Sequence, residues 1–89
     1  MQTQVEELIE TKETLVENKQ IVVYNDDFNT FDFVIESLIK VCKHEKVQAE
    51  QCTFLIHFKG KCIVKKGTYK ELEPMCTTLL ERGLTAEII

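Results

Sequence analysis

The sequence has no tryptophan, one proline and three glycines among its 89 residues, and it has no long uninterrupted apolar segment. A membrane-spanning helix needs about 20 consecutive apolar residues. A signal peptide needs a basic start followed by an apolar region, whereas residues 1–7 of this chain are mostly polar and acidic. We therefore expect a soluble, cytoplasmic protein with no membrane partner.

Positive charge is also in short supply, because 11 Lys and Arg residues stand against 15 Asp and Glu residues, for a net charge of −4. Nucleic-acid binding requires a basic footprint, so we expect no nucleic-acid partner. The chain has one basic cluster, at Lys59, Lys61, Lys65 and Lys66, and we interpret it as the solvated face of a short strand.

The acidic charge is concentrated at the start of the chain. Residues 1–20 contain five Glu and two Lys, and residues 21–89 contain ten acidic and nine basic residues. The hydrophobic content is 44%, which is enough for one compact domain with a modest core. We expect an acidic extension at 1–20, mobile or loosely helical, and a single core domain at 21–89.

Several motifs of catalytic and metal sites are missing. The chain has no Gly-rich phosphate loop, no HExxH and no GxSxG. Its four cysteines, Cys42, Cys52, Cys62 and Cys76, are ten, ten and fourteen residues apart with no C-x-x-C pair. We expect no enzyme activity, cofactor, metal or disulfide, and we place Cys42, Cys52 and Cys76 in the core. A nucleophile formed by a cysteine and His57 remains a minor alternative, because no oxyanion donor accompanies it.

The apolar periodicity predicts six elements. They are a strand at 21–24, helices at 30–43 and 47–58, a strand at 61–66, a third helix from Thr68 to Gly83 and a strand at 84–88. Thr68 and Glu71 have the spacing of a capping box, while Pro74 should disturb the helix that follows. The order β-α-α-β-α-β predicts an α+β domain, with a small three-stranded antiparallel sheet covered on one face by three helices.

Acidic side chains are placed at the end of the first predicted strand. Asn25, Asp26 and Asp27 directly follow the apolar run 21–24. Asn and Asp favour turns and helix caps, so this triplet alone could serve only to turn the chain. His57 alone would be interpreted as an ordinary core or surface histidine. Together, the triplet and His57 suggest a rim that binds a cation.

The segment 22–35, followed by Ala49, by Ile56-His57 and by Gly60 and Glu71, resembles the ClpS adaptor family of the bacterial Clp protease. The resemblance covers residues 21–89. It implies an adaptor that binds proteins with a destabilising N-terminal residue and delivers them to a hexameric AAA+ unfoldase, ClpA-like or ClpC-like. It also implies that the N-terminal extension takes part in engaging the unfoldase.

The resemblance also implies a division of the site into two parts. Asn25, Asp27 and His57 would contact the α-amino group of the substrate, with assistance from Asp26. The pocket for the first side chain would be formed by Phe31, Val34, Thr53, Ile56 and Leu84.

An α-amino group has a pKa of about 8 and is mostly a cation at neutral pH, so it needs hydrogen-bond acceptors such as these side chains.

Phe31 and Thr53 occupy positions where methionine is common in the family, so the preference among Leu, Phe, Tyr, Trp and Ile as the first residue of the substrate stays open. A docking module like the C-terminal domain of the ribosomal stalk protein is the alternative from a different functional class. An enzyme based on Asp27 and His57 is a weaker one.

Overall fold

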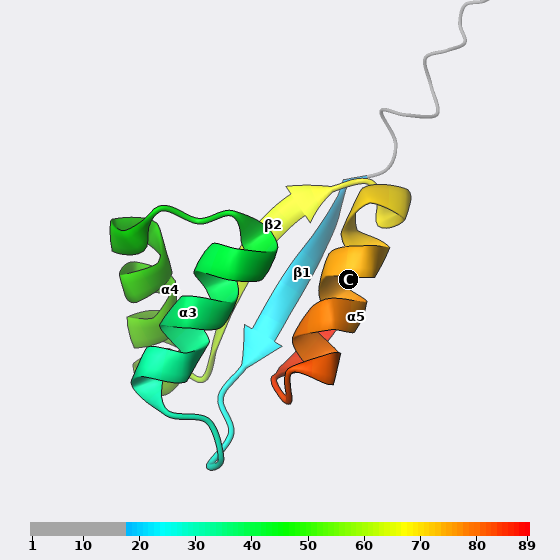
Figure 1. Cartoon of the computed structure of the whole chain (residues 1–89). Coiled ribbons are helices and arrows are strands. Elements are labelled where there is room, and N and C mark those ends of the chain that lie inside the picture. Colours follow the sequence, from blue (N-terminus) through cyan, green and yellow to red (C-terminus); the bar gives the residue numbers. More distant parts are fainter. Residues whose placement is uncertain (1–17) are drawn as a thin grey trace, which may run out of the picture.

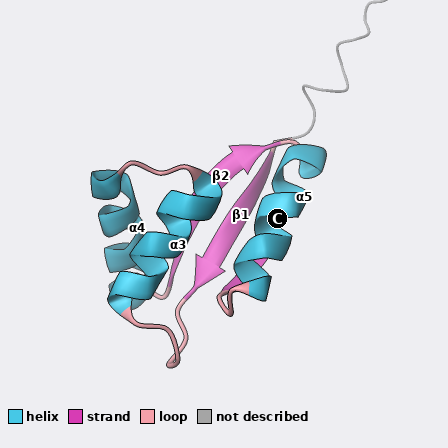
Figure 2. Cartoon of the chain, in the orientation of Figure 1, coloured by secondary structure: helices cyan, strands magenta, loops and turns pink. Residues whose placement is uncertain are grey.

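The computed structural model describes residues 18–89, and its elements follow the predicted order (Figures 1 and 2). They are β1 (Lys19–Tyr24), α3 (Phe31–Cys42), α4 (Lys46–Lys59), β2 (Lys61–Gly67), α5 (Tyr69–Glu81) and β3 (Thr85–Ile88). The strands form an antiparallel sheet in the order β2-β1-β3. The α+β fold predicted from the sequence is confirmed, with the helices lying against the sheet.

The core lies between the central strand and the helices. Ile21 and Val23 of β1 are almost fully buried, as are Leu38 of α3 and Leu79 of α5. Cys42 and Cys76 are buried among these side chains and Cys52 packs against them, so the predicted core role of the three cysteines is confirmed. Burial raises the pKa of the Cys42 thiol to about 11, which keeps this group protonated at neutral pH.

Local signals set the ends of the helices. Thr30 caps α3, because its Oγ1 accepts a hydrogen bond of 3.1 Å from the Phe33 amide. Thr68 and Glu71 form the predicted capping box at the start of α5. Pro74 stands inside α5, yet the helix continues from Tyr69 to Glu81 around it. Gly60 ends α4 with φ of 96°, a conformation that side chains with a Cβ rarely adopt.

The central strand starts earlier than predicted, since Lys19 and Gln20 already belong to β1 and pair with Gly67 and Lys66 of β2. These two residues had been expected in the acidic extension. The remaining expectations for that extension fall on residues 1–17, which lie outside the described residues.

Two polar side chains near the α3–α4 loop are more integrated than the sequence suggested. Lys65 does not simply face solvent, because its Nζ donates to the Cys42 carbonyl at the C-terminal end of α3 over 3.1 Å. His44 lies in the predicted loop but is buried, and its Nε2 lies 2.7 Å from the Val64 carbonyl oxygen. Lys65 thus ties β2 to the end of α3, and His44 ties the loop after α3 to β2.

Candidate functional site

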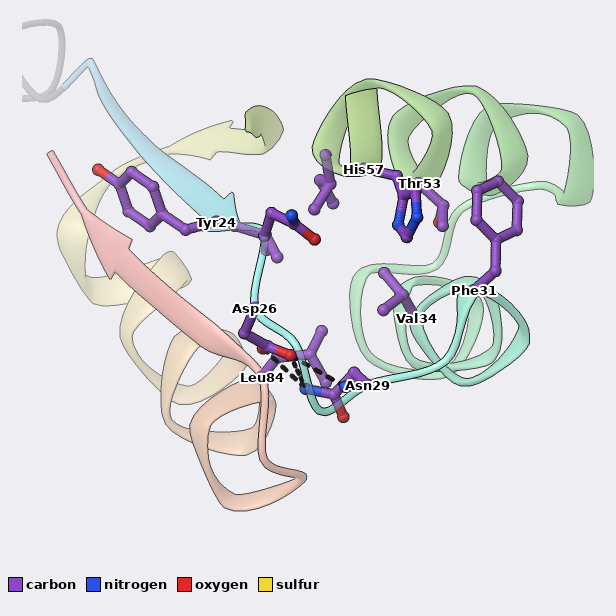
Figure 3. A pocket seen from close by; sticks show the side chains of 11 residues that line it. Tyr24, Asp26, Asn29, Phe31, Val34, Thr53, His57 and Leu84 are labelled. Carbon is purple, nitrogen blue, oxygen red and sulfur yellow. Dashed lines mark hydrogen bonds between the residues drawn. The ribbon is translucent and has the colours of Figure 1, made fainter. Parts of the chain in front are cut away.

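A hollow opens where the end of β1 meets α3 and α4 (Figure 3). Eight of the nine predicted site residues line it, namely Asn25, Asp26, Phe31, Val34, Thr53, Ile56, His57 and Leu84. Asp27 is the exception, because it is exposed and lies outside the lining. Val23, Tyr24 and Asn29 also line the hollow and were not predicted. Its free volume is about 10 Å³, which is space for about one water molecule.

Main-chain bonds at the end of β1 position the acidic loop beside α4. The Asn25 amide donates to the Gly60 carbonyl over 2.9 Å. Since Gly60 directly follows α4, this bond places Asn25 near the helix end that carries His57. The chain then turns at Asp26 toward the first residue of α3, Phe31.

Asp26 organises this turn with its carboxylate. Oδ1 accepts from the amides of Phe28 and Asn29, both at 2.9 Å, and Oδ2 accepts from Asn29 Nδ2 at 2.8 Å. Partial burial raises the pKa of Asp26, but the hydrogen bonds from Asn29, Phe28 and Thr85 outweigh it and hold the pKa below the ordinary value. The hollow thus contains a fixed carboxylate that is ionised at neutral pH.

Asn29 connects the acidic loop to the far end of the chain. Its Nδ2 donates to Asp26 and also to the Gly83 carbonyl, at 2.9 Å, in the turn before β3. Figure 3 shows Asp26 and Asn29 joined on one side of the hollow, close to Leu84. Asn29 could not be identified from the sequence beyond its place in a turn, because its partner Gly83 is 54 residues away.

Replacement of Asn29 by Ala should loosen this part of the rim. We expect the variant to lose roughly 1.5–3 kcal/mol of stability, the usual contribution of a hydrogen bond to a charged group, and the pKa of Asp26 to rise toward its ordinary value. The lowered pKa contributes stability that is present above about pH 4, the unfolded value, and is lost as the pH falls through the folded value. The variant should therefore lose less stability on acidification.

Urea denaturation at neutral and acidic pH, together with an NMR titration of Asp26, measures both effects. The control is Asn25→Ala, which removes a side chain of the same loop for which the structure shows no hydrogen bond among the described residues, and which leaves the bond from the main-chain amide intact. If the two variants showed the same change in the pKa of Asp26, the Asn29 contact would not be its cause.

The floor of the hollow is apolar and buried. Val34 of α3, Ile56 of α4 and Leu84 are each less than 8% exposed. Thr53 is buried too, and its hydroxyl group donates to the Ala49 carbonyl over 2.7 Å. This hydroxyl hydrogen is therefore already engaged in a hydrogen bond within α4. Tyr24 contributes little, since its ring points away from the hollow in Figure 3 and its hydroxyl donates to Glu87 of β3.

The mouth of the hollow is aromatic. The rings of Phe31 and His57 meet edge to face, with their centroids 5.7 Å apart. Phe31 is 36% exposed, so its ring is partly open to solvent at the edge of the hollow. A group larger than a water molecule can enter only if side chains around the hollow move apart.

The arrangement suits a ligand that is cationic at one end and apolar at the other. Asp26 supplies a negative charge, while His57 and Asn25 add possible acceptors at the same rim.

Among residues 18–89, no group of three or more His, Cys, Asp or Glu side chains is placed to hold a metal ion. No helix in this same range is long and apolar enough to span a membrane.

Comparison with known proteins gives consistent matches. The family model "ATP-dependent Clp protease adaptor protein ClpS" matches residues 5–87. The ClpS adapter protein of Thermosynechococcus vestitus is 36% identical over 69 residues, which cover 76% of this chain and 73% of that protein. The corresponding protein of Acetivibrio thermocellus is 38% identical, with 72% of this chain and 70% of that protein covered.

A solved structure shares the fold. It is Agrobacterium tumefaciens ClpS2 bound to L-phenylalaninamide, with a TM-score of 0.78, 16% identity, and coverage of 82% of this chain and 95% of that one. The sequence matches extend the similarity beyond the fold, because two of them exceed 35% identity over most of both chains.

Proposed function

Because the chain belongs to the ClpS family of adaptor proteins of the ATP-dependent Clp protease, we propose that it selects protein substrates by their N-terminal residue. The recognised features are a free α-amino group and a large apolar first side chain. The observation that carries the proposal is the hollow itself, where an ionised carboxylate adjoins a buried apolar floor.

The α-amino group is bound at the rim by Asp26, Asn25 and His57. The sequence prediction gave the amine contact to Asp27, with assistance from Asp26. We propose a larger share for Asp26, because it lines the hollow in this structure and Asp27 does not. Three donors of an ammonium group can then meet a carboxylate oxygen, an amide oxygen and an imidazole nitrogen.

The first side chain of the substrate occupies the floor between Val34, Thr53, Ile56 and Leu84. Since the free volume is about 10 Å³, the side chains that line the hollow move apart to admit it. The neighbour ClpS2 is bound to L-phenylalaninamide, a compound with a free α-amino group next to a benzyl side chain, which supports this ligand class. Membership of the ClpS family also favours this function over that of a docking module of the ribosomal-stalk type.

Both halves of the ligand are needed for useful affinity. Burial of a Leu or Phe side chain contributes about 1.5–3 kcal/mol, and each charge-assisted hydrogen bond contributes about 1.5–3 kcal/mol. Association itself costs at least about 4 kcal/mol. The apolar half alone does not reach that cost, so an internal Leu or Phe in a chain is not bound.

Substitution of the two adjacent aspartates tests the site. We expect Asp26→Asn to weaken binding of a peptide with Leu or Phe at its N-terminus by roughly tenfold to a hundredfold, because it removes the charge that faces the amine. Asp27→Asn removes the same charge one residue away and should change the affinity less than threefold. Fluorescence anisotropy with a labelled peptide measures both.

His57→Ala is the accompanying variant, since His57 takes no part in the hydrogen bonds that hold the loop. Its affinity should also fall about tenfold. Equal effects of Asp26→Asn and Asp27→Asn, together with a silent His57→Ala, would refute the assignment of the rim.

The bound substrate is delivered to the AAA+ unfoldase of the Clp protease, a hexamer of the ClpA or ClpC kind, in the cytoplasm. The adaptor role of the family supports this partner. The chain then acts by binding and transfer, with no catalytic residue of its own, and the alternative of an enzyme based on Asp27 and His57 is not favoured because Asp27 lies outside the hollow.

A further inference from the structure

We infer that a row of four aromatic rings, one at the start of α3 and three on α4, forms a second binding site, which takes a large apolar side chain at the third residue of the substrate. This inference rests on the proposed function, because it requires the first residue to be held in the hollow. It extends recognition beyond the first residue to the segment that follows.

The helix α4 is apolar on two opposite faces. One face carries Ala49, Thr53 and Ile56, which are buried against the core. The other face carries Phe54 and Phe58, which are 55% and 64% exposed. Val47 lies on this face about two helical turns before Phe54 and is 63% exposed. A single apolar stripe would be enough to attach the helix to the core. The second stripe is therefore available for a partner.

The exposed rings are continuous with the hollow. Phe31 and His57 line it, and the ring of His57 lies 5.4 Å from that of Phe58, edge to face. Phe58 in turn lies 4.4 Å from Phe54. The four rings thus form an unbroken row that begins at the mouth of the hollow and continues over the outer surface of α4. We call this row the aromatic ladder.

The geometry of an extended peptide determines which residue reaches the ladder. Successive side chains of an extended chain point to opposite sides. When the first side chain enters the hollow, the second points to solvent and the third returns to the protein surface, about 6.6 Å from the first. Beyond the mouth, the ladder continues from His57 to Phe58 with 5.4 Å between the ring centroids, and the third side chain is therefore assigned to Phe58.

The ladder favours some third residues over others. Leu, Ile, Met or an aromatic residue can stack on Phe58 and Phe54 and cover their exposed faces. An Asp or Glu at this position would lose hydration beside apolar rings and would face their negative π surfaces. The preferred order at the third position is a large apolar residue, then Gly, then Asp.

A coupling experiment tests the site. The probes are labelled peptides that begin Leu-Ser-Leu, Leu-Ser-Gly, Leu-Leu-Ser and Leu-Ser-Asp with a common remainder, and the protein is the full chain. Phe58→Ala should weaken binding of the Leu-Ser-Leu peptide fivefold to tenfold. It should change binding of the Leu-Ser-Gly and Leu-Leu-Ser peptides less than twofold, so that the effect is coupled to the third residue.

Val47→Ala is the matched control, since Val47 lies on the same exposed face eleven residues earlier, about 16 Å along the helix. It should leave all four affinities unchanged. An equal effect of Phe58→Ala on every peptide, or a coupling to the second residue instead of the third, would overturn the inference.

Two further outcomes separate this inference from the proposed function. If the Leu-Ser-Gly peptide binds only with a free amine and the third residue has no influence, the ladder fails while the proposed function stands. If no Leu-initiated peptide binds, the proposed function fails first. Sedimentation velocity of the wild type and of Phe58→Ala completes the test. If the wild type were a dimer and Phe58→Ala a monomer, the ladder would be a contact between two copies, and its role in substrate binding would be overturned.

Discussion

Acetylation of the α-amino group should reduce the affinity of a Leu- or Phe-initiated peptide by roughly a hundredfold or more. The modification removes the positive charge and two of the three hydrogen-bond donors. Loss of two charge-assisted hydrogen bonds at about 1.5–3 kcal/mol each accounts for an effect of this size. The carboxylate of Asp26 would also be left facing a neutral amide.

Isothermal titration calorimetry with the free and the acetylated form of one peptide measures this effect directly. The control is a peptide with a free amine and Ser at the first position, which lacks the large apolar side chain. It should also bind weakly. Unchanged affinity after acetylation would mean that the apolar floor binds the side chain without the rim, and the proposed selection of N-terminal residues would be wrong.

The second large effect concerns stability, and two adjacent leucines of α5 provide it. Leu79 is fully buried and Leu80 is 51% exposed. Leu79→Ala should cost about 2–5 kcal/mol, because it removes a core side chain and leaves a cavity. This is a large part of the roughly 5–15 kcal/mol that stabilises a small domain.

Leu80→Ala makes the same chemical change one residue later and should stay within about 0.5 kcal/mol of the wild type. Urea denaturation followed by circular dichroism gives both values. Equal losses in the two variants would show that burial in α5 does not set the stability of the domain.

Much of the fold could be predicted because local signals agreed with one another. The apolar period of α3, the capping box at Thr68 and the glycines at 60 and 83 each indicated the end or the face of an element. Pro74 did not mark an end of α5, since the helix continues through it from Tyr69 to Glu81.

The site was harder to predict, because its details depend on contacts between distant segments. A sequence shows that Asp26 and Asp27 are adjacent, but not that only the first faces the hollow. The partner of Asn29 at Gly83 and the contact of His44 with Val64 have no local signature at all. The aromatic row on α4 was hidden for a different reason, as a helix with two apolar faces lacks a clean one-sided period.

The hydrogen bond from Asn29 to the Gly83 carbonyl has a thermodynamic consequence. It closes the rim with residues from both halves of the chain, so the hollow exists only in the native state. A ligand that binds there shifts the unfolding equilibrium by mass action toward the folded protein. Ligand binding should therefore raise the apparent stability of the protein, and a molecule that unfolds loses its ligand.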